Sequence, residues 1–188
     1  MNTSLELYIE LITKKLEQFI DWTGRCVSWL VLAMVMFTFL VVVLRYAFDL
    51  GWIALQESIS YFHSIVFLVG AAYTMKHNGH VRVDIFYSQL SESGKAWIDL
   101  VGHLFILMPV MIFIIWVSWP YIEASWQVTE GSREAGGLPG VYLLKSLILI
   151  MASLLILQGV ALILRALLTI SSNSTLDKIT RQNREESF

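Results

Sequence analysis

Four long stretches of this sequence contain no Asp, Glu, Lys or Arg. They cover residues 26–44, 58–75, 100–122 and 146–164, and each is 18 to 23 residues long. The hydrocarbon core of a bilayer is about 30 Å thick, and a helix needs about 20 mostly apolar residues to cross it. We therefore predict an all-α membrane protein with four transmembrane helices, at about 26–45, 56–76, 98–122 and 143–166.

The composition agrees with a chain whose main solvent is lipid. Of its 188 residues, 56% are hydrophobic and 15% are charged, whereas soluble domains carry about 25% charged residues. The net charge of −2 is uninformative, but the lack of a basic stripe argues against a nucleic-acid partner. The single cysteine, Cys26, has no intramolecular partner for a disulfide. Acidic residues before the first apolar run, and the length of that run, argue against a cleaved signal peptide.

Lys and Arg are distributed unequally between the hydrophilic segments. Ten of the 13 lie in the N-terminal segment, the middle loop and the C-terminal tail, and the other three are Arg45, Arg133 and Lys145. Because cytoplasmic segments are enriched in positive charge, we predict a multi-pass protein of the bacterial inner membrane with both termini in the cytoplasm. Tryptophans at both predicted boundaries are typical of aromatic belts: Trp22, Trp29 and Trp97 on the inner side, and Trp52, Trp119 and Trp126 on the outer side.

The segments that flank the spans differ in character. Residues 5–23 alternate apolar and charged positions at helical spacing, which predicts an amphipathic N-terminal interfacial helix that lies on lipid or packs on a partner. We expect residues 1–170 to form a single membrane domain. Residues 171–188 are polar, and we expect a disordered cytoplasmic tail there.

The loops contain recognisable turn and cap signals. Asn78-Gly79 predicts a turn after the second span, and Ser91 predicts an N-cap for the helix that leads into the third. The second outer loop, over residues 126–140, is rich in glycine and carries mixed charge. It is long enough to contact another molecule outside the membrane.

Polar residues within the spans are few, although such residues usually mark function in membrane proteins. Arg45 and Glu57 lie at the outer ends of the first two spans, where they either pair with each other or contact a partner subunit or lipid headgroup. Pro109 and Gln158 are the only modest candidates for a substrate path. The sequence contains no nucleophile with a base, phosphate loop or cysteine cluster, so we expect a supporting subunit and not an enzyme.

The histidines suggest two further sites, both of which the sequence disfavours. His63 and His103 invite a haem interpretation, but their predicted depths differ by about 15 Å along the membrane normal, and one iron needs both axial ligands. His77, His80 and Asp84 match no specific metal-site spacing. We therefore expect no cofactor and no metal in this chain.

Several short motifs, in this order, resemble a known family. They are Arg45-Tyr46-Ala47-Phe48, Trp52, Gln56-Glu57-Ser58, Gly70-Ala71-Ala72, His80-Val81-Arg82-Val83-Asp84, Trp119-Pro120-Tyr121, Ser125-Trp126, Glu130-Gly131-Ser132 and Gly136-Gly137-Leu138-Pro139. Between four spans of this orientation, the chain from about Trp22 to Leu168 resembles the small membrane subunit of tripartite ATP-independent periplasmic (TRAP) transporters, the DctQ-like family.

The resemblance implies partners and roles. Such a subunit pairs with a large DctM-like permease that carries the substrate and sodium sites, and a periplasmic binding protein delivers the substrate, usually an organic acid anion. The small subunit is expected to act as a scaffold surrounded by phospholipids. By resemblance, the residues expected at the subunit interface or in the fold are Arg45, Tyr46, Trp52, Glu57, Gly70, His80 and Asp84. Those expected to face the binding protein are Trp126, Glu130, Arg133, Leu138 and Pro139.

Two alternatives remain beside this interpretation. One is a membrane-anchor redox subunit that binds haem through His63 and His103. The other is a small self-sufficient exporter that works as a dimer, although the spans lack the embedded carboxylate that such an exporter would need.

Overall fold

The protein is an elongated bundle of helices, seen here in a computed structural model that describes residues 3–79 and 87–185. The described elements are α1 (Thr3–Ala47), α2 (Ile53–Lys76), α4 (Glu92–Gly102), the π-helical segment η1 (His103–Leu107), α5 (Met108–Gln127) and α6 (Val141–Glu185). Four helical stretches are long and apolar enough to cross a membrane, with α4, η1 and α5 forming the third. The prediction of an all-α protein with four spans is confirmed.

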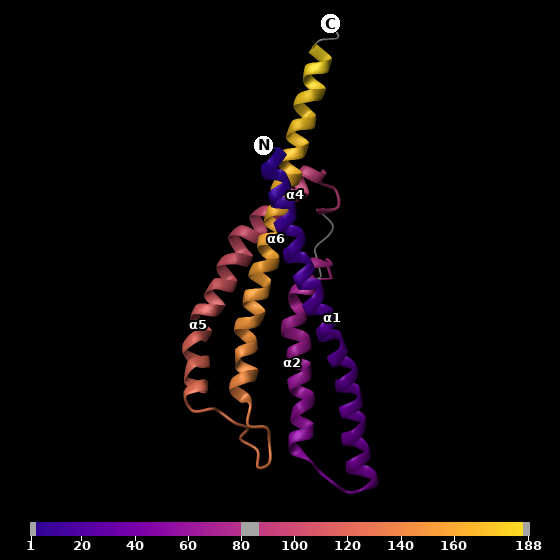
Figure 1. Cartoon of the computed structure of the whole chain (residues 1–188), viewed down its shortest axis with the longest axis vertical. Coiled ribbons are helices and arrows are strands. Elements are labelled where there is room, and N and C mark those ends of the chain that lie inside the picture. The colour runs from indigo at the N-terminus through magenta and orange to yellow at the C-terminus, as the bar shows by residue number, and fades with distance from the viewer. Residues whose placement is uncertain (1–2, 80–86, 186–188) are drawn as a thin grey trace.

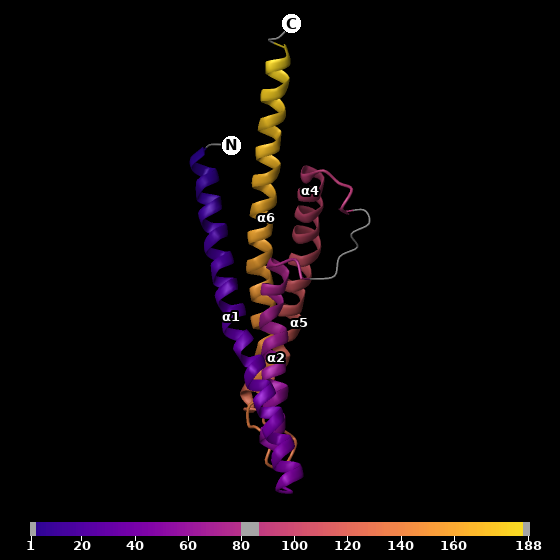
Figure 2. The same cartoon turned by 90° about the vertical axis from the view of Figure 1, so that its right-hand side faces the viewer.

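The chain runs up and down, so its connections separate into two ends (Figure 1). The start of α1, the end of α2, the start of α4 and the end of α6 lie at one end, which we call the terminal end. The α1–α2 and α5–α6 loops lie at the other, the loop end. The helix α6 is central: it contacts α1, α2, α4 and α5, and Figure 2 shows it between α1 and α4.

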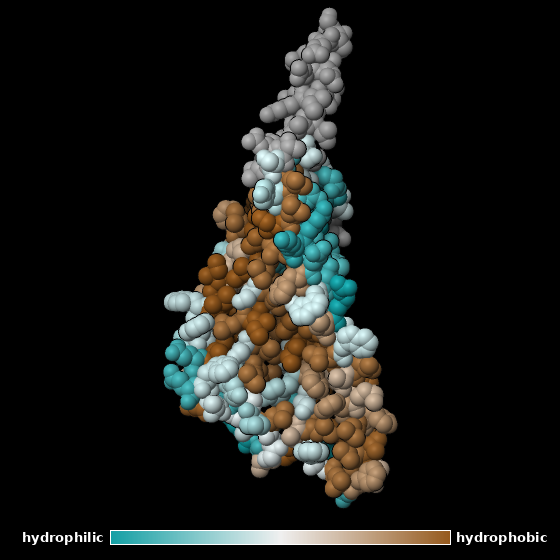
Figure 3. Space-filling view, viewed as in Figure 1, coloured by the Kyte–Doolittle hydropathy of each residue, from teal (hydrophilic) through white to brown (hydrophobic). Residues whose placement is uncertain are grey.

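The packed interior is small. One cluster of buried side chains joins all four spans, and it consists of Ile20, Ala72, Met111, Ala152, Leu154 and Leu155. Most large apolar side chains are instead exposed, such as Trp29 and Trp116 at 72% and 73%. The space-filling view shows this apolar surface over the middle of the bundle (Figure 3). A helix that is apolar on all sides is typical of a membrane span, so lipid accounts for most of this exposed surface.

The turn and cap signals are confirmed. Asn78 adopts a φ of 53°, the Gly79 N–H donates to the Thr74 carbonyl at 2.9 Å, and the Asn78 N–H donates to the Met75 carbonyl at 3.2 Å. These two bonds form a Schellman motif, which ends α2 by satisfying carbonyls of its last turn. The Ser91 hydroxyl accepts from the Gly94 N–H at 3.2 Å and caps α4.

The segments that flank the first and last spans are continuous with them. The amphipathic N-terminal segment is helical and forms the first part of α1, which runs unbroken from Thr3 to Ala47. Similarly, α6 continues past its apolar run to Glu185. Neither junction contains proline, and the one glycine, Gly24 in α1, does not interrupt the helix. Extending an existing helix is much easier than nucleating a new one.

The third span departs from regular α-helix at η1. The Met108 N–H donates to the His103 carbonyl, five residues back. Pro109 follows directly and has no N–H to donate to the previous turn. The Leu107 side chain packs directly against Gly159 of α6. A Cβ at Gly159 would lie only 2.7 Å from Leu107 Cδ2, so a larger residue at position 159 would push Leu107 away.

Candidate functional site: two charged clusters at the ends of the bundle

At the terminal end, α1 is fastened to α2 by a carboxylate. Asp21 accepts a hydrogen bond from Lys76 Nζ and another, at 3.1 Å, from His77 Nε2. Lys76 Nζ also donates to the Glu17 carbonyl oxygen at 3.0 Å. The lysine side chain is only 15% exposed and the aspartate 28%, so the pair is partly screened from solvent and holds the two helices at a fixed height.

The same end of α1 is fastened to α6. Arg165 Nη2 lies 2.8 Å from Glu17 Oε1 and donates to Oε2 at 3.0 Å. The Glu17 side chain is 11% exposed, whereas that of Arg165 is 61% exposed. In the part of the chain that the structure describes, the carboxylate therefore depends on this one guanidinium for compensation, while the guanidinium retains access to water. A buried charge without its partner is strongly destabilising.

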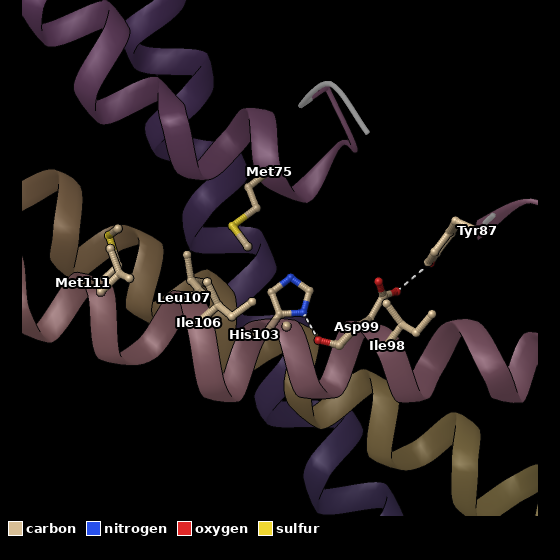
Figure 4. Close-up of a pocket in the computed structure, with 10 residues that line it drawn as sticks. Met75, Tyr87, Ile98, Asp99, His103, Ile106, Leu107 and Met111 are labelled. Carbon is tan, nitrogen blue, oxygen red and sulfur yellow. Dashed lines mark hydrogen bonds between the residues drawn. The ribbon is translucent and has the colours of Figure 1, made fainter. Parts of the chain in front are cut away.

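A groove of about 480 Å³ opens near this end, between α2 and the third span. Its lining is mostly apolar, with Asp99 and Tyr87 at its polar part (Figure 4). The Tyr87 hydroxyl donates to Asp99 Oδ2 at 2.8 Å. His103 Nδ1 donates to the Asp99 backbone carbonyl at 2.5 Å. Asp99 therefore binds Tyr87 through its side chain and His103 through its backbone, at the turn where α4 passes into η1.

At the loop end, a single carboxylate organises the α5–α6 loop. Glu57 of α2 accepts from the Ser132 hydroxyl through Oε1 and from the Leu138 backbone N–H at 2.6 Å through Oε2. Between these anchors, a Cβ at Gly137 would lie 2.4 Å from Ser132 Oγ and 2.8 Å from Glu57 Oε1. Only glycine fits this closely to the carboxylate, which gives the Gly136-Gly137 pair a structural reason.

The first half of the same loop is fastened to its own helices. Glu130 accepts from Lys145 Nζ and from the buried Ser125 hydroxyl at 2.6 Å. Lys145 also lies 4.0 Å from the centre of the Tyr121 ring. The hydrogen bonds from Lys145 and Ser125 hold the pKa of the Glu130 carboxyl below its ordinary value. The loop is therefore anchored as a charged structure at neutral pH.

Trp126 adds an aromatic contact to this anchor. Its Nε1–H donates to the Ser146 hydroxyl at 2.8 Å, and its ring packs edge-on against Tyr142 at 4.7 Å between ring centres. The prediction that Trp126 faces a binding protein concerns the ring, which remains 48% exposed. Its polar atom is occupied by Ser146 of α6.

The remaining predicted residues divide into three groups. Arg45, Tyr46 and Trp52 are exposed at the loop end, and the alternative in which Arg45 pairs with Glu57 is wrong, because the Glu57 oxygens bind Ser132 and Leu138. Arg133 and Pro139 are exposed in the loop, and Leu138 is half-buried. Gly70 has open space where a Cβ would stand, and His80 and Asp84 lie outside the described residues.

The histidines of the haem interpretation lie in different surroundings. His63 is exposed on α2 and stacks on Phe67 at 6.2 Å. His103 lines the groove opposite Met75 of α2 (Figure 4). His63 and Met75 are 12 residues apart on one helix, about 18 Å along its axis. One iron cannot bridge that separation, so the arrangement does not favour a shared haem.

Sequence reasoning missed the terminal-end cluster. Glu17 and Asp21 are two of the charged positions in the amphipathic pattern of residues 5–23, a pattern that gives them no partner, whereas in the structure they bind Arg165 of α6 and Lys76 of α2. Their spacing of four residues, on one side of a helix that runs into a span, was the available signal. The sequence also gave no signal for two loop anchors. Ser132 binds Glu57, 75 residues away, and Lys145 binds Glu130, 15 residues away across the loop.

The comparisons with known proteins point to one family. The model of "Tripartite ATP-independent periplasmic transporters, DctQ component" matches residues 7–169. The chain belongs to this family. It is thus a membrane component of a transporter and not an enzyme, and its four apolar helices make it a multi-pass inner-membrane protein. Searches of curated proteins and of solved structures found no match. Both charged clusters fall within the matched region, as do α1 from Leu7 onwards and α6 up to Thr169.

Proposed function

We propose that this DctQ component is a scaffold that fixes a large DctM-like permease in the membrane, and that it carries no part of the substrate path itself. The observation that supports this most is where the charges lie. In the described bundle, the Asp21–Lys76 and Glu17–Arg165 pairs join spans at the terminal end, and the Glu130–Lys145 pair fastens the α5–α6 loop to α6 at the loop end. The runs between these ends contain no Asp, Glu, Lys or Arg, so the bundle is charged at its ends and apolar between them.

The interior offers little for a solute. In the described part of the chain, the buried polar side chains are Thr13, Glu17, Ser125 and Gln158, and of these only Gln158 lies well inside an apolar run. Secondary transporters place binding groups and broken helices near the middle of the membrane. We therefore assign the substrate and sodium sites to the permease, and we infer that uptake of an organic acid anion is driven by the sodium gradient.

Transport measurements test the scaffold role. Liposomes that contain this chain alone are expected to accumulate no solute, with or without a sodium gradient. Liposomes that contain the chain, its permease and the binding protein are expected to accumulate an organic acid anion only when sodium is higher outside. Uptake by the chain alone would overturn the proposal. When the chain and the permease are expressed together, the two are expected to co-purify.

We further propose that both termini are cytoplasmic and that the loop over residues 128–140 faces the periplasmic binding protein. The charge asymmetry supports this orientation. The tip of the loop, at Arg133, Glu134 and Ala135, is exposed, and the hydrogen bonds of the Glu57 and Glu130 carboxylates go to other residues. The tip is therefore available to a partner.

Cysteine labelling tests the orientation. In a Cys26→Ser background, Ala135→Cys is expected to react with an impermeant maleimide in intact cells, and Ser172→Cys only after lysis. Both positions are exposed, so accessibility is matched. The reverse pattern would show that the protein is inserted the other way.

A further inference from the structure

A second groove lies between α5 and α6 at the loop end, and its lining is both aromatic and acidic. It has a volume of about 330 Å³ and is lined by Trp119, Ile122, Glu123, Trp126, Ser146 and Leu149. The three α5 residues Trp119, Glu123 and Trp126 are spaced by four and three, so they share one face of that helix. The groove therefore combines two indole rings with one carboxylate.

Within residues 3–79 and 87–185, the carboxylate of Glu123 has no counter-charge. The other two acidic side chains that anchor this end are satisfied, Glu57 by Ser132 and Leu138 and Glu130 by Lys145 and Ser125. Across the described residues, by contrast, nothing forms an ion pair or a side-chain hydrogen bond with Glu123. It lies one turn before the end of α5 at Gln127, the depth at which a span meets the headgroups.

The aromatic part of the groove is fixed in position. The Trp126 ring is held by Ser146 through its N–H and by Tyr142 through its edge, yet it remains 48% exposed, and Trp119 is 57% exposed. Indole faces attract cations, with primary and quaternary ammonium groups as the usual ligands. A carboxylate between two such rings complements an ammonium group better than it complements an anion or a neutral sugar.

The groove continues into an apolar strip that runs towards the middle of the membrane. Ile112 and Trp116 precede Trp119 on the same face of α5 and are 58% and 73% exposed. From Ile112 to Glu123 the strip is about 16 Å long, which is comparable to the extended length of much of a phospholipid acyl chain. The surface thus has an unpaired carboxylate at one end and an apolar strip of this length leading from it. This combination matches a lipid with a cationic headgroup better than it matches a soluble ligand.

We propose that the Trp119–Glu123–Trp126 groove binds a zwitterionic phospholipid through its headgroup ammonium, with an acyl chain along Ile112 and Trp116. Glu123 pairs with the ammonium, the two indoles flank it, and the lipid phosphate remains towards water. This site goes beyond the scaffold role and does not depend on it, because it is formed by this chain alone.

Lipid retention tests the site. The full chain is equilibrated in mild detergent with equal amounts of phosphatidylethanolamine and phosphatidylglycerol of identical acyl chains, and the lipid that stays bound is counted by mass spectrometry. The wild type is expected to retain phosphatidylethanolamine about fivefold over phosphatidylglycerol, the factor that about 1 kcal/mol represents. Glu123→Gln is expected to abolish this preference, whereas Glu134→Gln, an exposed carboxylate of the nearby loop, is expected to keep it.

Several outcomes would overturn the proposal: no preference in the wild type, an unchanged preference in Glu123→Gln, or an equal loss in Glu134→Gln. If Glu123→Gln fails to fold, Trp119→Leu replaces it and is expected to lower the preference. A photoreactive residue at Leu149 in the membrane, with the permease present, is expected to cross-link lipid. A cross-link to the permease instead would show that a protein occupies the groove.

Discussion

Carboxylates stabilise both ends of this bundle, but they bind different kinds of partner at each end. At the terminal end, Glu17 and Asp21 bind cationic side chains of α6 and α2, so each bond joins one span to another. At the loop end, Glu57 binds a hydroxyl and a backbone N–H of a loop. Charge at the terminal end therefore fixes the helices, whereas charge at the loop end fixes the shape of a surface.

Removing one partner of the Glu17–Arg165 pair should have the largest effect on stability, and the two partners should differ. Arg165→Leu leaves a carboxylate that is 11% exposed without compensation, at a cost of about 3 kcal/mol. Glu17→Leu leaves an arginine that is 61% exposed and can still be hydrated, so it should cost about 1 kcal/mol or less. Thermal unfolding in detergent would measure both, and equal losses would contradict the proposed asymmetry.

At the loop end, Glu57→Leu should release the loop without loosening the helices. We expect cleavage within residues 131–138 by an added protease to become about tenfold faster, because the loop loses both of its bonds to α2. The thermal midpoint should change much less than in Arg165→Leu. Glu134→Gln is the matched control, and a large fall in the midpoint of Glu57→Leu would show that this end also fixes the helices.

Gly137→Ala should disturb the same loop through shape alone. Its Cβ would meet Ser132 Oγ at 2.4 Å, and displacing the loop should cost about 1–2 kcal/mol. Gly51→Ala is the control, because nothing lies within 4 Å of a Cβ at that position. Hydrogen exchange of the Leu138 amide should quicken in Gly137→Ala and stay unchanged in Gly51→Ala.

The smallest expected effect is a pH dependence confined to the loop end. The pKa of Glu130 is lowered by its hydrogen bonds to Lys145 and Ser125, so its contribution to loop order is complete above the ordinary value of 4.5 and is lost as the pH falls through the lowered pKa. Protease cleavage of the loop should therefore increase only below about pH 4.5. Glu130→Gln should cleave faster at neutral pH and show a weaker pH dependence, because the Glu57 carboxylate still holds the loop. A dependence as strong as in the wild type would assign it to Glu57.

Much of the architecture was predictable because lipid imposes simple limits. The four apolar runs gave four spans, and Asn78-Gly79 and Ser91 marked a turn and a cap whose hydrogen bonds are local. The errors arose where the deciding partner is remote. The N-terminal segment gave the pattern of a surface helix, yet Glu17 pairs with Arg165, 148 residues away. Similarly, Arg45 lies close to Glu57 in sequence, but the carboxylate binds residues 75 and 81 positions away.

By itself, the sequence determined the number of spans and their approximate ends, because charged residues are excluded from the bilayer and each charge-free run marks one crossing. The ordered motifs at the ends of these runs indicated the family. Only the tertiary structure decided which charges pair, where the third span changes to η1, and that Glu123, beside two tryptophans, lacks a counter-charge among the residues that the structure describes. The physical reason is range: helix formation and exclusion of charge act on neighbouring residues, whereas pairing and grooves arise only when distant helices come together.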